Sequence, residues 1–234
     1  MYKDKRIIGI ITARGGSTSI PRKNLAELSG KPLIWYTIDA AQKSRLLTRT
    51  VVSTDNQEIA RVSREYGADI PFMRPVELAQ DDTPHLPVVQ HALAWLKDNE
   101  GQAYDYVMIL QPTSPLRTAD DIDSAIKKAV ETDADSVMSM VALSDFDPVK
   151  VKEIDGDVIR PLFGDEGASS ALRQNGKKAY KRNCAIYLTK TEHIMNNDLF
   201  GTVSRAYSMP SERSVDINEP QDLEFAEFLL SKKV

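Results

Sequence analysis

Short apolar segments alternate along the chain with segments in which apolar residues recur every three or four positions. The apolar segments span residues 7–11, 51–54, 104–110, 136–142 and 185–188. A strand that is covered on both faces has a continuously apolar sequence, and strands that alternate with helices form βαβ units around a mostly parallel sheet. This pattern predicts a Rossmann-like, three-layer α/β fold with a mostly parallel (mixed) sheet.

Two of the helices are expected to begin at capping residues. Asp55 is followed three positions later by Glu58, and Thr118 by Asp121. This is the spacing of a capping box, in which two side chains satisfy the free N–H groups at the start of a helix.

The alternation stops after Leu143. The stretch from there to Arg182 contains prolines, glycines and charges with little periodicity. An irregular segment of this length is usually functional or forms an interface. We therefore expect a single domain over residues 1–234, with residues 145–182 as an inserted arm.

The net charge and the apolar runs of the chain argue against some classes of partner. A net charge of −4 provides no general basic field for nucleic acid. The chain has no run of the roughly 18 apolar residues that a membrane span requires, and its first residues lead into a strand without a signal-peptide cleavage site. We expect no nucleic-acid partner, no membrane span and a cytoplasmic location.

The loop after the first strand combines glycines with cations. It contains Gly15-Gly16 and, within ten residues, Arg14, Arg22 and Lys23. Ligands of open α/β sheets bind beyond the carboxyl ends of the strands, and glycines let backbone N–H groups approach a phosphate. Three cations beside such a turn suit a triphosphate, although the loop matches neither Gly-x-Gly-x-x-Gly nor the Walker pattern. A solvated basic turn is the alternative interpretation.

Further motifs follow this loop over nearly the whole chain. They are ARGGSTSIPRKN at 13–24, GKPL at 30–33, VSTD at 52–55, RP at 74–75 with LA at 78–79, LQPTSPLR at 110–117, RN at 182–183 with AIY at 185–187, and RSVDI at 213–217 with DL at 222–223. In this order they resemble the N-acylneuraminate cytidylyltransferases (CMP-sialic acid synthetases). The resemblance implies a fold of the nucleotide-diphospho-sugar transferase type. It also implies transfer of CMP from CTP to the anomeric hydroxyl of a nine-carbon acidic sugar, with release of pyrophosphate.

The resemblance assigns the first loop to CTP. The residues that it implies for the nucleotide are Ala13, Arg14, Gly15, Ser17, Lys23, Asn24, Arg74, Asp82 and Thr83. Of these, Arg14 and Lys23 are the expected catalytic cations on the leaving pyrophosphate, and the other catalytic residue is Asp216.

The acceptor sugar is assigned to residues that lie later in the chain. They are Gln111, Arg173, Arg182 and Tyr187. An arginine fork suits a sugar carboxylate because it donates two parallel hydrogen bonds. A strand-end residue that satisfies nearby backbone is the alternative for Gln111, and a solvated arm residue is the alternative for Arg173.

A metal site is implied shortly before the expected last helix. By resemblance Asp216 is a Mg²⁺ ligand, and Asn218 stands where the family usually has a second aspartate. Mg²⁺ prefers oxygen ligands and bridges phosphates. Asn218 with Gln221 also has the spacing of a helix cap, and the two interpretations are compatible.

Several positions depart from the family pattern. Thr18-Ser19 replaces the usual Lys-Gly, which removes one cation from the phosphate side. His85 falls in a stretch that is usually built from small residues. Cys184, the one cysteine, replaces a glycine; it cannot form an intrachain disulfide and is expected to be a small buried residue.

The expected reaction is in-line attack of the sugar hydroxyl on the α-phosphate of CTP, catalysed mainly by positioning and charge neutralisation. The arm resembles the family's dimerisation extension, which predicts a homodimer. Three alternatives remain: CTP-dependent activation of KDO or another ulosonic acid, a non-catalytic CTP or CMP-sugar binding protein, and a dinucleotide-dependent oxidoreductase. The absence of Gly-x-Gly-x-x-Gly argues against the last.

Overall fold

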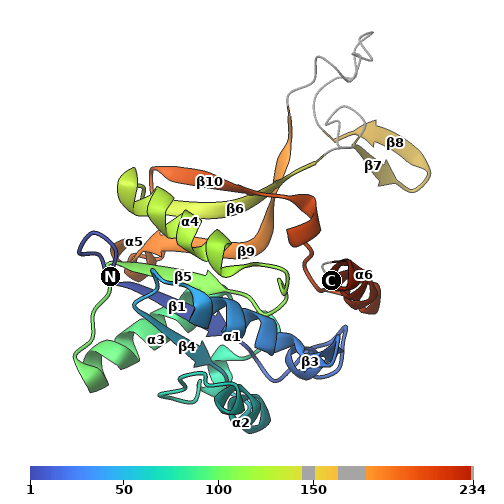
Figure 1. The fold of residues 1–234 in the computed structure, drawn as a ribbon. Helices are drawn as coiled ribbons and strands as arrows, with labels where there is room; N and C mark the ends of the chain where they lie inside the picture. Colours follow the sequence, from blue (N-terminus) through green and yellow to red (C-terminus); the bar gives the residue numbers. More distant parts are fainter. Residues whose placement is uncertain (144–150, 163–177, 233–234) are drawn as a thin grey trace.

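The structure is a computed structural model that describes residues 1–143, 151–162 and 178–232. Its centre is a six-stranded sheet with the strand order β10-β6-β9-β5-β1-β4 (Figure 1). The strands are β1 (Ile7–Thr12), β4 (Arg49–Ser53), β5 (Tyr106–Leu110), β6 (Ser136–Ala142), β9 (Tyr180–Lys190) and β10 (Ser204–Met209). A short pair, β2 (Glu27–Leu28) and β3 (Lys31–Pro32), follows the first loop.

The sheet contains both parallel and antiparallel strand pairs, as predicted. β1 is parallel to both β4 and β5, and β6 is parallel to β10. β9 lies between β5 and β6 and is antiparallel to both. The prediction of a mostly parallel, mixed sheet is therefore confirmed.

Helices cover both faces of the sheet and make the three predicted layers (Figure 1). Alternate residues of β1 show this: Ile7 and Ile11 pack in one core cluster with residues of α1 (Leu33–Lys43), α2 (Gln57–Glu65) and α4 (Ala119–Glu131). Ile8 and Ile10 pack on the other face, in a cluster with residues of α3 (His85–Glu100) and α5 (Thr191–Met195). Side chains of a strand point alternately to its two faces, so one buried strand serves both cores.

Of the three predicted helix caps, the structure confirms one and contradicts two. Thr118 and Asp121 form the predicted capping box of α4. α2 is capped by Asn56, whose side chain accepts from two backbone N–H groups, and not by Asp55. The last helix, α6 (Pro220–Ser231), begins with a capping box of Glu219 and Asp222 in place of Asn218 and Gln221.

Part of the predicted arm lies within the described residues. β7 (Lys152–Asp155) and β8 (Val158–Pro161) form an antiparallel hairpin that projects away from the sheet (Figure 1). The hairpin exposes the apolar side chains of Ile154, Val158 and Ile159, and Leu162 directly after it is also exposed. Residues 144–150 and 163–177 of the arm region are outside the described part of the chain.

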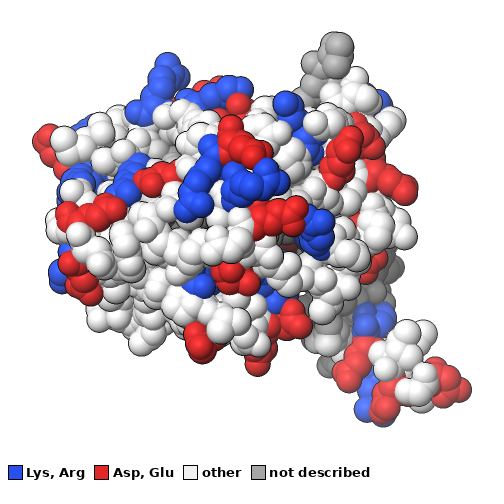
Figure 2. Space-filling view, turned by 90° about the horizontal axis from the view of Figure 1, so that it is seen from below, with Lys and Arg blue, Asp and Glu red and all other residues white. Residues whose placement is uncertain are grey.

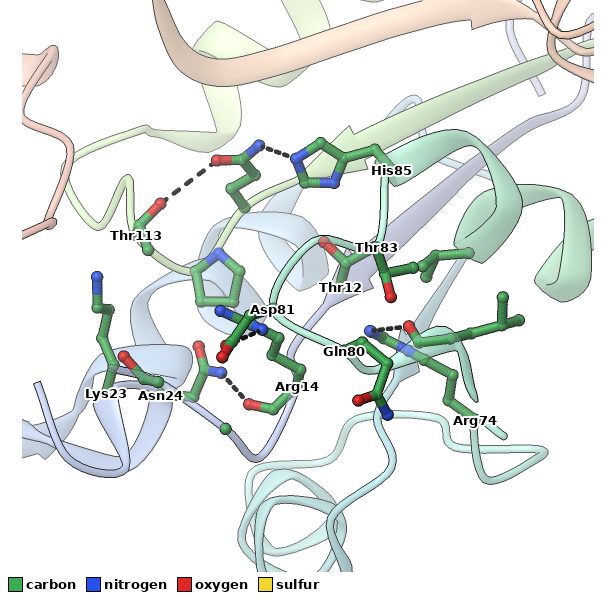
Figure 3. Close-up of a pocket in the computed structure, with 16 residues that line it drawn as sticks. Thr12, Arg14, Lys23, Asn24, Arg74, Gln80, Asp81, Thr83, His85 and Thr113 are labelled. Carbon is green, nitrogen blue, oxygen red and sulfur yellow. Dashed lines mark hydrogen bonds and ion pairs between the residues drawn. The ribbon is translucent and has the colours of Figure 1, made fainter. Parts of the chain in front are cut away.

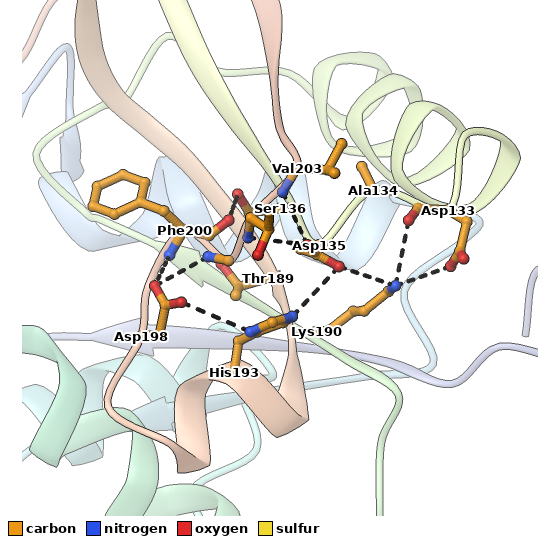
Figure 4. A network of polar contacts seen from close by, with 12 residues as sticks. Asp133, Ala134, Asp135, Ser136, Thr189, Lys190, His193, Asp198, Phe200 and Val203 are labelled. Atoms are coloured by element: carbon orange, nitrogen blue, oxygen red, sulfur yellow. Dashed lines mark hydrogen bonds and ion pairs between the residues drawn. The ribbon is translucent and has the colours of Figure 1, made fainter.

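A polar network fixes the end of the sheet where β6 begins and β9 ends (Figure 4). Asp135 accepts hydrogen bonds from the backbone N–H groups of Thr202 and Val203, and it forms ion pairs with Lys190 and, when the imidazole is charged, His193. The Val203 N–H and the Lys190 ammonium hold the pKa of Asp135 at about 2. The network ties the loop before β10 to the body of the sheet.

Charge on one face of the molecule and the apolar length of the helices can be compared with the expectations from the sequence. Basic and acidic side chains are interspersed on the face drawn in Figure 2. Among the residues that the structure describes, no helix is long and apolar enough to cross a membrane.

Candidate active site

A pocket opens at the carboxyl ends of β1 and β5, where the sheet rule places ligands. Figure 3 shows Arg14 between Lys23 on one side of this pocket and Arg74 on the other. The sequence-predicted residues that line it are Arg14, Ser17, Lys23, Asn24, Arg74, Thr83 and Gln111. We call it the nucleotide pocket below, after the ligand that the sequence resemblance implies for these residues.

The loop after β1 is shaped by its own backbone contacts. Asp55 accepts a hydrogen bond from the N–H of Gly15 at 2.9 Å, and Asn24 donates its side-chain N–H to the carbonyl of Arg14 at 2.9 Å. A Cβ on Gly15 would lie 2.8 Å from the side chain of Asn56, so only glycine fits there. Of the other residues predicted for the nucleotide, Ala13 is buried beneath the loop. The family-like loop is therefore held by the segment that caps α2.

Arg14 reaches across the pocket to an acidic residue. Its guanidinium donates to the carboxylate of Asp81 at 2.6 Å. Asp81 lines the pocket, whereas its neighbour Asp82, predicted for the nucleotide, is exposed and lies outside the lining. A triphosphate in this pocket would have to compete with this carboxylate for Arg14, because both are anions.

Arg74 is buried and has carbonyl and hydroxyl partners in place of a carboxylate. Its Nε donates to the hydroxyl of Ser53 at 3.1 Å, and its two terminal nitrogens donate to the carbonyls of Ser53 and Leu78. Burial lowers the pKa of Arg74 to about 10, which leaves it charged at neutral pH. The residue thus joins the end of β4 to the segment that precedes α3.

Lys23 connects the nucleotide pocket to the segment before α6. Its ammonium donates to the main-chain oxygens of Ile217 and Asn218, at 3.0 and 3.1 Å. The hydroxyl of Ser19 donates to the same Asn218 oxygen. Burial lowers the pKa of Lys23, although the charges of Asp216 and Asp222 act in the opposite direction.

A second pocket adjoins this segment. The sequence-predicted residues in its wall are Arg182, Asp216 and Asn218, and Asn183, Asp222 and Phe225 also line it. The guanidinium of Arg182 lies 5.3 Å from the ring centre of Phe200. We call this cavity the acidic-segment pocket.

Asp216 has the chemistry of a metal ligand. Its Oδ1 is buried and has no hydrogen-bond partner, and its Oδ2 accepts from the side-chain amide of Asn218 at 3.2 Å. Mg²⁺ in proteins is commonly held by one or two carboxylates, with substrate phosphates and water completing the shell. The described residues contain no group of three or more His, Cys, Asp or Glu that would form a metal site by themselves. The carboxylate of Asp216 fits a Mg²⁺ site that substrate phosphates and water would complete, and Asn218 would join it only through its side-chain oxygen, since its amide nitrogen faces Asp216.

Gln111 follows β5 and is fixed through its backbone. Its carbonyl accepts from the Thr37 hydroxyl and from Arg117, both at 3.3 Å. Arg117 is fully buried, which lowers its pKa to about 9, and it also donates to the carbonyl of Ala185 at 2.7 Å. The Gln111 side chain is therefore not needed to satisfy the strand end, and it contacts His85 and Thr113 at the pocket wall.

β9 carries an irregularity close to these residues. Its pairing with β6 shifts between Met138 and Met140, and Cys184 in the displaced stretch has a φ of 63°. Ser139 holds the stretch by donating to the carbonyl of Ile186 and accepting from its N–H. Such bulges re-aim side chains at the rims of sheets and near sites.

The other residues predicted for the sugar have different environments. Tyr187 is buried, which raises the pKa of its hydroxyl, and it donates to the sulfur of Cys184 at 3.4 Å. Cys184 is half-buried, less than expected for a small core residue. Arg173 lies outside the described residues.

Sequence reasoning missed Asp81, His85 and Thr113 as pocket residues. His85 was visible as a departure from the family pattern, and Thr113 belongs to the LQPTSPLR motif. Asp81 had no signal beyond its position beside Asp82.

Comparisons with known proteins show the family to which the chain belongs. A family model described as "Cytidylyltransferase" matches residues 8–233. A CMP-N,N'-diacetyllegionaminic acid synthase of Legionella pneumophila is 35% identical over 96% of this chain and 96% of its own length. An N-acylneuraminate cytidylyltransferase of Escherichia coli is 32% identical over 97% of this chain, which spans 53% of that protein.

A solved structure has the same fold at low identity. It is a CMP:2-keto-3-deoxy-manno-octonic acid synthetase complexed with CTP, and it is 15% identical, with a TM-score of 0.73 over 98% of this chain and all of that one. At this identity the likeness concerns the fold alone. It supports the predicted Rossmann-like, nucleotide-sugar transferase architecture.

Proposed function

This chain belongs to the cytidylyltransferase family, and we propose on that basis that it transfers CMP from CTP to the anomeric hydroxyl of a nine-carbon acidic sugar, releasing pyrophosphate. The observation that carries the proposal is the contact between Lys23 and the carbonyls of Ile217 and Asn218. It brings a cation of the glycine loop next to the acidic segment that contains Asp216. The proposed phosphate-binding and metal-binding groups are thus close together at the end of the sheet where ligands of such folds bind.

Arg14 and Lys23 are the proposed partners of the phosphates. Both line the nucleotide pocket, and both have partners in the free protein that a triphosphate can replace: Asp81 for Arg14, and two carbonyls for Lys23. Cations that are already in place stabilise the charge that develops on the leaving pyrophosphate without reorganisation. Asn24 and Ser17 line the same wall and complete the proposed phosphate contacts.

Arg74 and Thr83 are the proposed contacts for the cytidine end of CTP. Arg74 is immobilised by Ser53 and Leu78, so its remaining N–H groups have a fixed direction. A fixed donor array discriminates between bases better than a mobile one, because the wrong base leaves buried polar groups unpaired.

Asp216 and Asn218 would hold Mg²⁺ in this proposal. When bound there, Mg²⁺ neutralises phosphate charge and makes the α-phosphorus a better electrophile. The unpartnered Oδ1 of Asp216 supports this role, since a buried carboxylate oxygen without a donor is otherwise unfavourable. Asn218 contributes an amide and no charge, which predicts weaker metal binding than two carboxylates would give.

Gln111 and Arg182 are the proposed acceptor-sugar contacts. Gln111 lies in the nucleotide pocket and Arg182 in the acidic-segment pocket, on either side of the Lys23 contact. A nonulosonic sugar has a carboxylate that suits Arg182 and hydroxyls that suit an amide. Neuraminic, legionaminic and pseudaminic types are all compatible with these groups, and KDO is the alternative acceptor.

We further propose a cytoplasmic homodimer. The β7–β8 hairpin exposes Ile154 and Ile159 away from the sheet, and apolar surface of this kind favours contact with a second copy. Sedimentation of the intact protein at micromolar concentration would give the mass of two chains, and a Ile154→Asp/Ile159→Asp variant would give that of one. A wild-type monomer would contradict the dimer, and recovery of the native protein from a membrane or periplasmic fraction would contradict the location.

The reaction is tested by pyrophosphate release. Purified protein with Mg²⁺ and CTP is assayed against sialic, legionaminic, pseudaminic and KDO sugars, with ATP, GTP and UTP as alternative nucleotides. Release with CTP and one nine-carbon sugar supports the proposal and identifies the acceptor. Thermal stabilisation by CTP without release from any sugar would instead indicate a nucleotide-binding protein.

A further inference from the structure

The side chain of His85 contacts that of Gln111 at the wall of the nucleotide pocket. His85 is the first residue of α3, and Gln111 follows β5. The imidazole Nε2 lies 2.9 Å from the amide nitrogen of Gln111, and the Thr113 hydroxyl donates to the amide oxygen at 3.4 Å (Figure 3). The amide is thus held from both of its ends.

The backbone of Gln111 does not decide how this amide is turned. Its carbonyl is fixed by Thr37 and Arg117, which determines where the side chain begins. Rotation by half a turn about the last side-chain bond would exchange the amide nitrogen and oxygen without changing the shape. Only the neighbouring side chains distinguish the two orientations.

The orientation found here requires a particular form of His85. An amide NH₂ group donates and does not accept, so the imidazole nitrogen that faces it has to accept. His85 is then neutral, with its proton on Nδ1. The environment favours the neutral form: although the residue is exposed, packing around its ring and the charge of Arg74 lower the pKa of His85.

We propose that His85 is a positioning residue that turns the Gln111 amide, with its nitrogen toward the imidazole and its oxygen toward Thr113, and so determines which group Gln111 offers to the acceptor sugar. This inference rests on the proposed function. With the nitrogen turned to His85, one amide hydrogen is used by the imidazole and the second remains for a sugar oxygen. The preferred acceptor therefore presents a hydrogen-bond acceptor at this point, such as a hydroxyl oxygen or a carbonyl.

The first test measures the tautomer of His85 in the ligand-free protein. A long-range ¹H–¹⁵N spectrum of ¹⁵N-labelled protein distinguishes protonated from bare ring nitrogens, and the chain has only three histidines to assign. The His85→Gln variant identifies the His85 signals by their loss. A proton on Nδ1 and a bare Nε2 are expected at pH 8, whereas a proton on Nε2 would overturn the proposal.

The second test separates the two substrates by kinetics. The His85→Ala variant is expected to raise KM for the acceptor sugar about five- to tenfold, the effect of one hydrogen bond, and to change KM for CTP less than twofold. The His85→Gln variant restores sugar binding, because its side-chain oxygen can accept close to the Nε2 position. In the His85→Ala/Gln111→Ala double variant, the loss is expected to equal that of Gln111→Ala alone.

The opposite pattern would overturn the assignment. A rise of KM for CTP alone, or fully additive effects of His85→Ala and Gln111→Ala, would show that His85 does not act through Gln111. His91→Gln is the matched control, since His91 is on the same helix with its ring against Phe72 and outside the pocket lining. If wild-type protein turned over no sugar, the proposed function would be wrong, and the tautomer spectrum would still decide whether His85 turns the Gln111 amide.

Discussion

The ammonium group of Lys23 lies 3.0 Å from the main-chain oxygen of Ile217, across 194 positions of sequence. A second contact, from the same nitrogen to the oxygen of Asn218, is 3.1 Å long. The loop after β1 and the segment before α6 are therefore one wall of the site. A change in either part is expected to affect both phosphate and metal binding.

Replacement of Lys23 by alanine removes a cation from the proposed phosphate site and its hydrogen bond to Ile217. We expect kcat/KM for pyrophosphate release to fall about 100- to 1000-fold, the usual effect of losing one preorganised charge donor. Steady-state assays of Lys23→Ala measure this. Lys31→Ala is the control, because Lys31 lies over the rings of Trp35 and Tyr66 and lines neither pocket described above. Unchanged turnover of Lys23→Ala would remove Lys23 from the mechanism.

The Asp216→Asn substitution keeps the shape of the side chain and removes its charge. We expect the Mg²⁺ concentration for half-maximal activity to rise at least about tenfold, since a charge-assisted contact contributes about 1.5–3 kcal/mol. A Mg²⁺ titration of the assay measures the shift. Glu212→Gln is the control, because Glu212 is exposed and outside both linings. The same Mg²⁺ dependence in Asp216→Asn and wild type would exclude Asp216 as the ligand.

Arg213 is expected to contribute to stability through Asp121, which is buried. The guanidinium donates to both carboxylate oxygens, at 2.8 and 3.1 Å. We expect Arg213→Ala to lower the free energy of unfolding at pH 7 by about 2–3 kcal/mol, less than the about 3–5 of a fully buried pair. Arg45→Ala is the control: Arg45 is 3.8 Å from Asp123 but 82% exposed, so its loss should change stability by less than about 1 kcal/mol.

The same pair has a predictable pH dependence. Burial of Asp121 opposes its ionisation, but hydrogen bonds from Arg213, Thr118 and Tyr207 outweigh burial and lower its pKa. Because the pKa is lower in the folded protein, this stability is fully present above the unfolded value of about 3.9 and is lost as the pH falls through the folded value. Urea unfolding between pH 5 and pH 3 should show a smaller loss of stability in Arg213→Ala than in wild type. An equal loss in both proteins would contradict this account.

A side chain at Gly201 is expected to destabilise the folded protein. Its φ is 65°, and an added Cβ would lie 2.3 Å from the Cβ of Asp135. We expect Gly201→Ala to cost about 2–5 kcal/mol, the sum of left-handed strain of about 1–2 and overpacking of about 1–3. Gly101→Ala is the matched control, since Gly101 has a φ of 64° with nothing within 4 Å, and only the strain should remain. Equal losses, measured by thermal unfolding, would show that the contact with Asp135 is unimportant.

The fold was predictable where strands are covered on both faces. The expected segment 136–142 coincides with β6, and 7–11 matches β1 to within one residue. β10 (Ser204–Met209) was missed because it is an edge strand with mostly exposed side chains and no apolar run. The antiparallel direction of β9 depends on the path of the chain in three dimensions, and no local pattern indicates it.

Composition and the order of the motifs pointed to some residues of the candidate site and not to others. The cations of the first loop were singled out because they lie beside a Gly-Gly turn, and Asp216 because its motif resembles the family's metal ligand; both roles stay predictions. The roles of Arg117 and Arg74 were not, because they depend on which carbonyls the guanidinium meets. The contact of His85 with Gln111 was not predicted either, because it joins two residues that lie 26 positions apart in the sequence.

The long sequence separation between Lys23 and Asn218 also bears on how the protein is made. A ribosome releases the chain from its N-terminus, so the glycine loop and most strands of the sheet emerge well before residues 216–218. A nascent chain can thus build much of the central sheet while it still lacks the proposed metal ligands and the carbonyls that hold Lys23 and Ser19. The proposed use of CTP would therefore become possible only after residues 216–218 have been synthesised, as a consequence of vectorial translation.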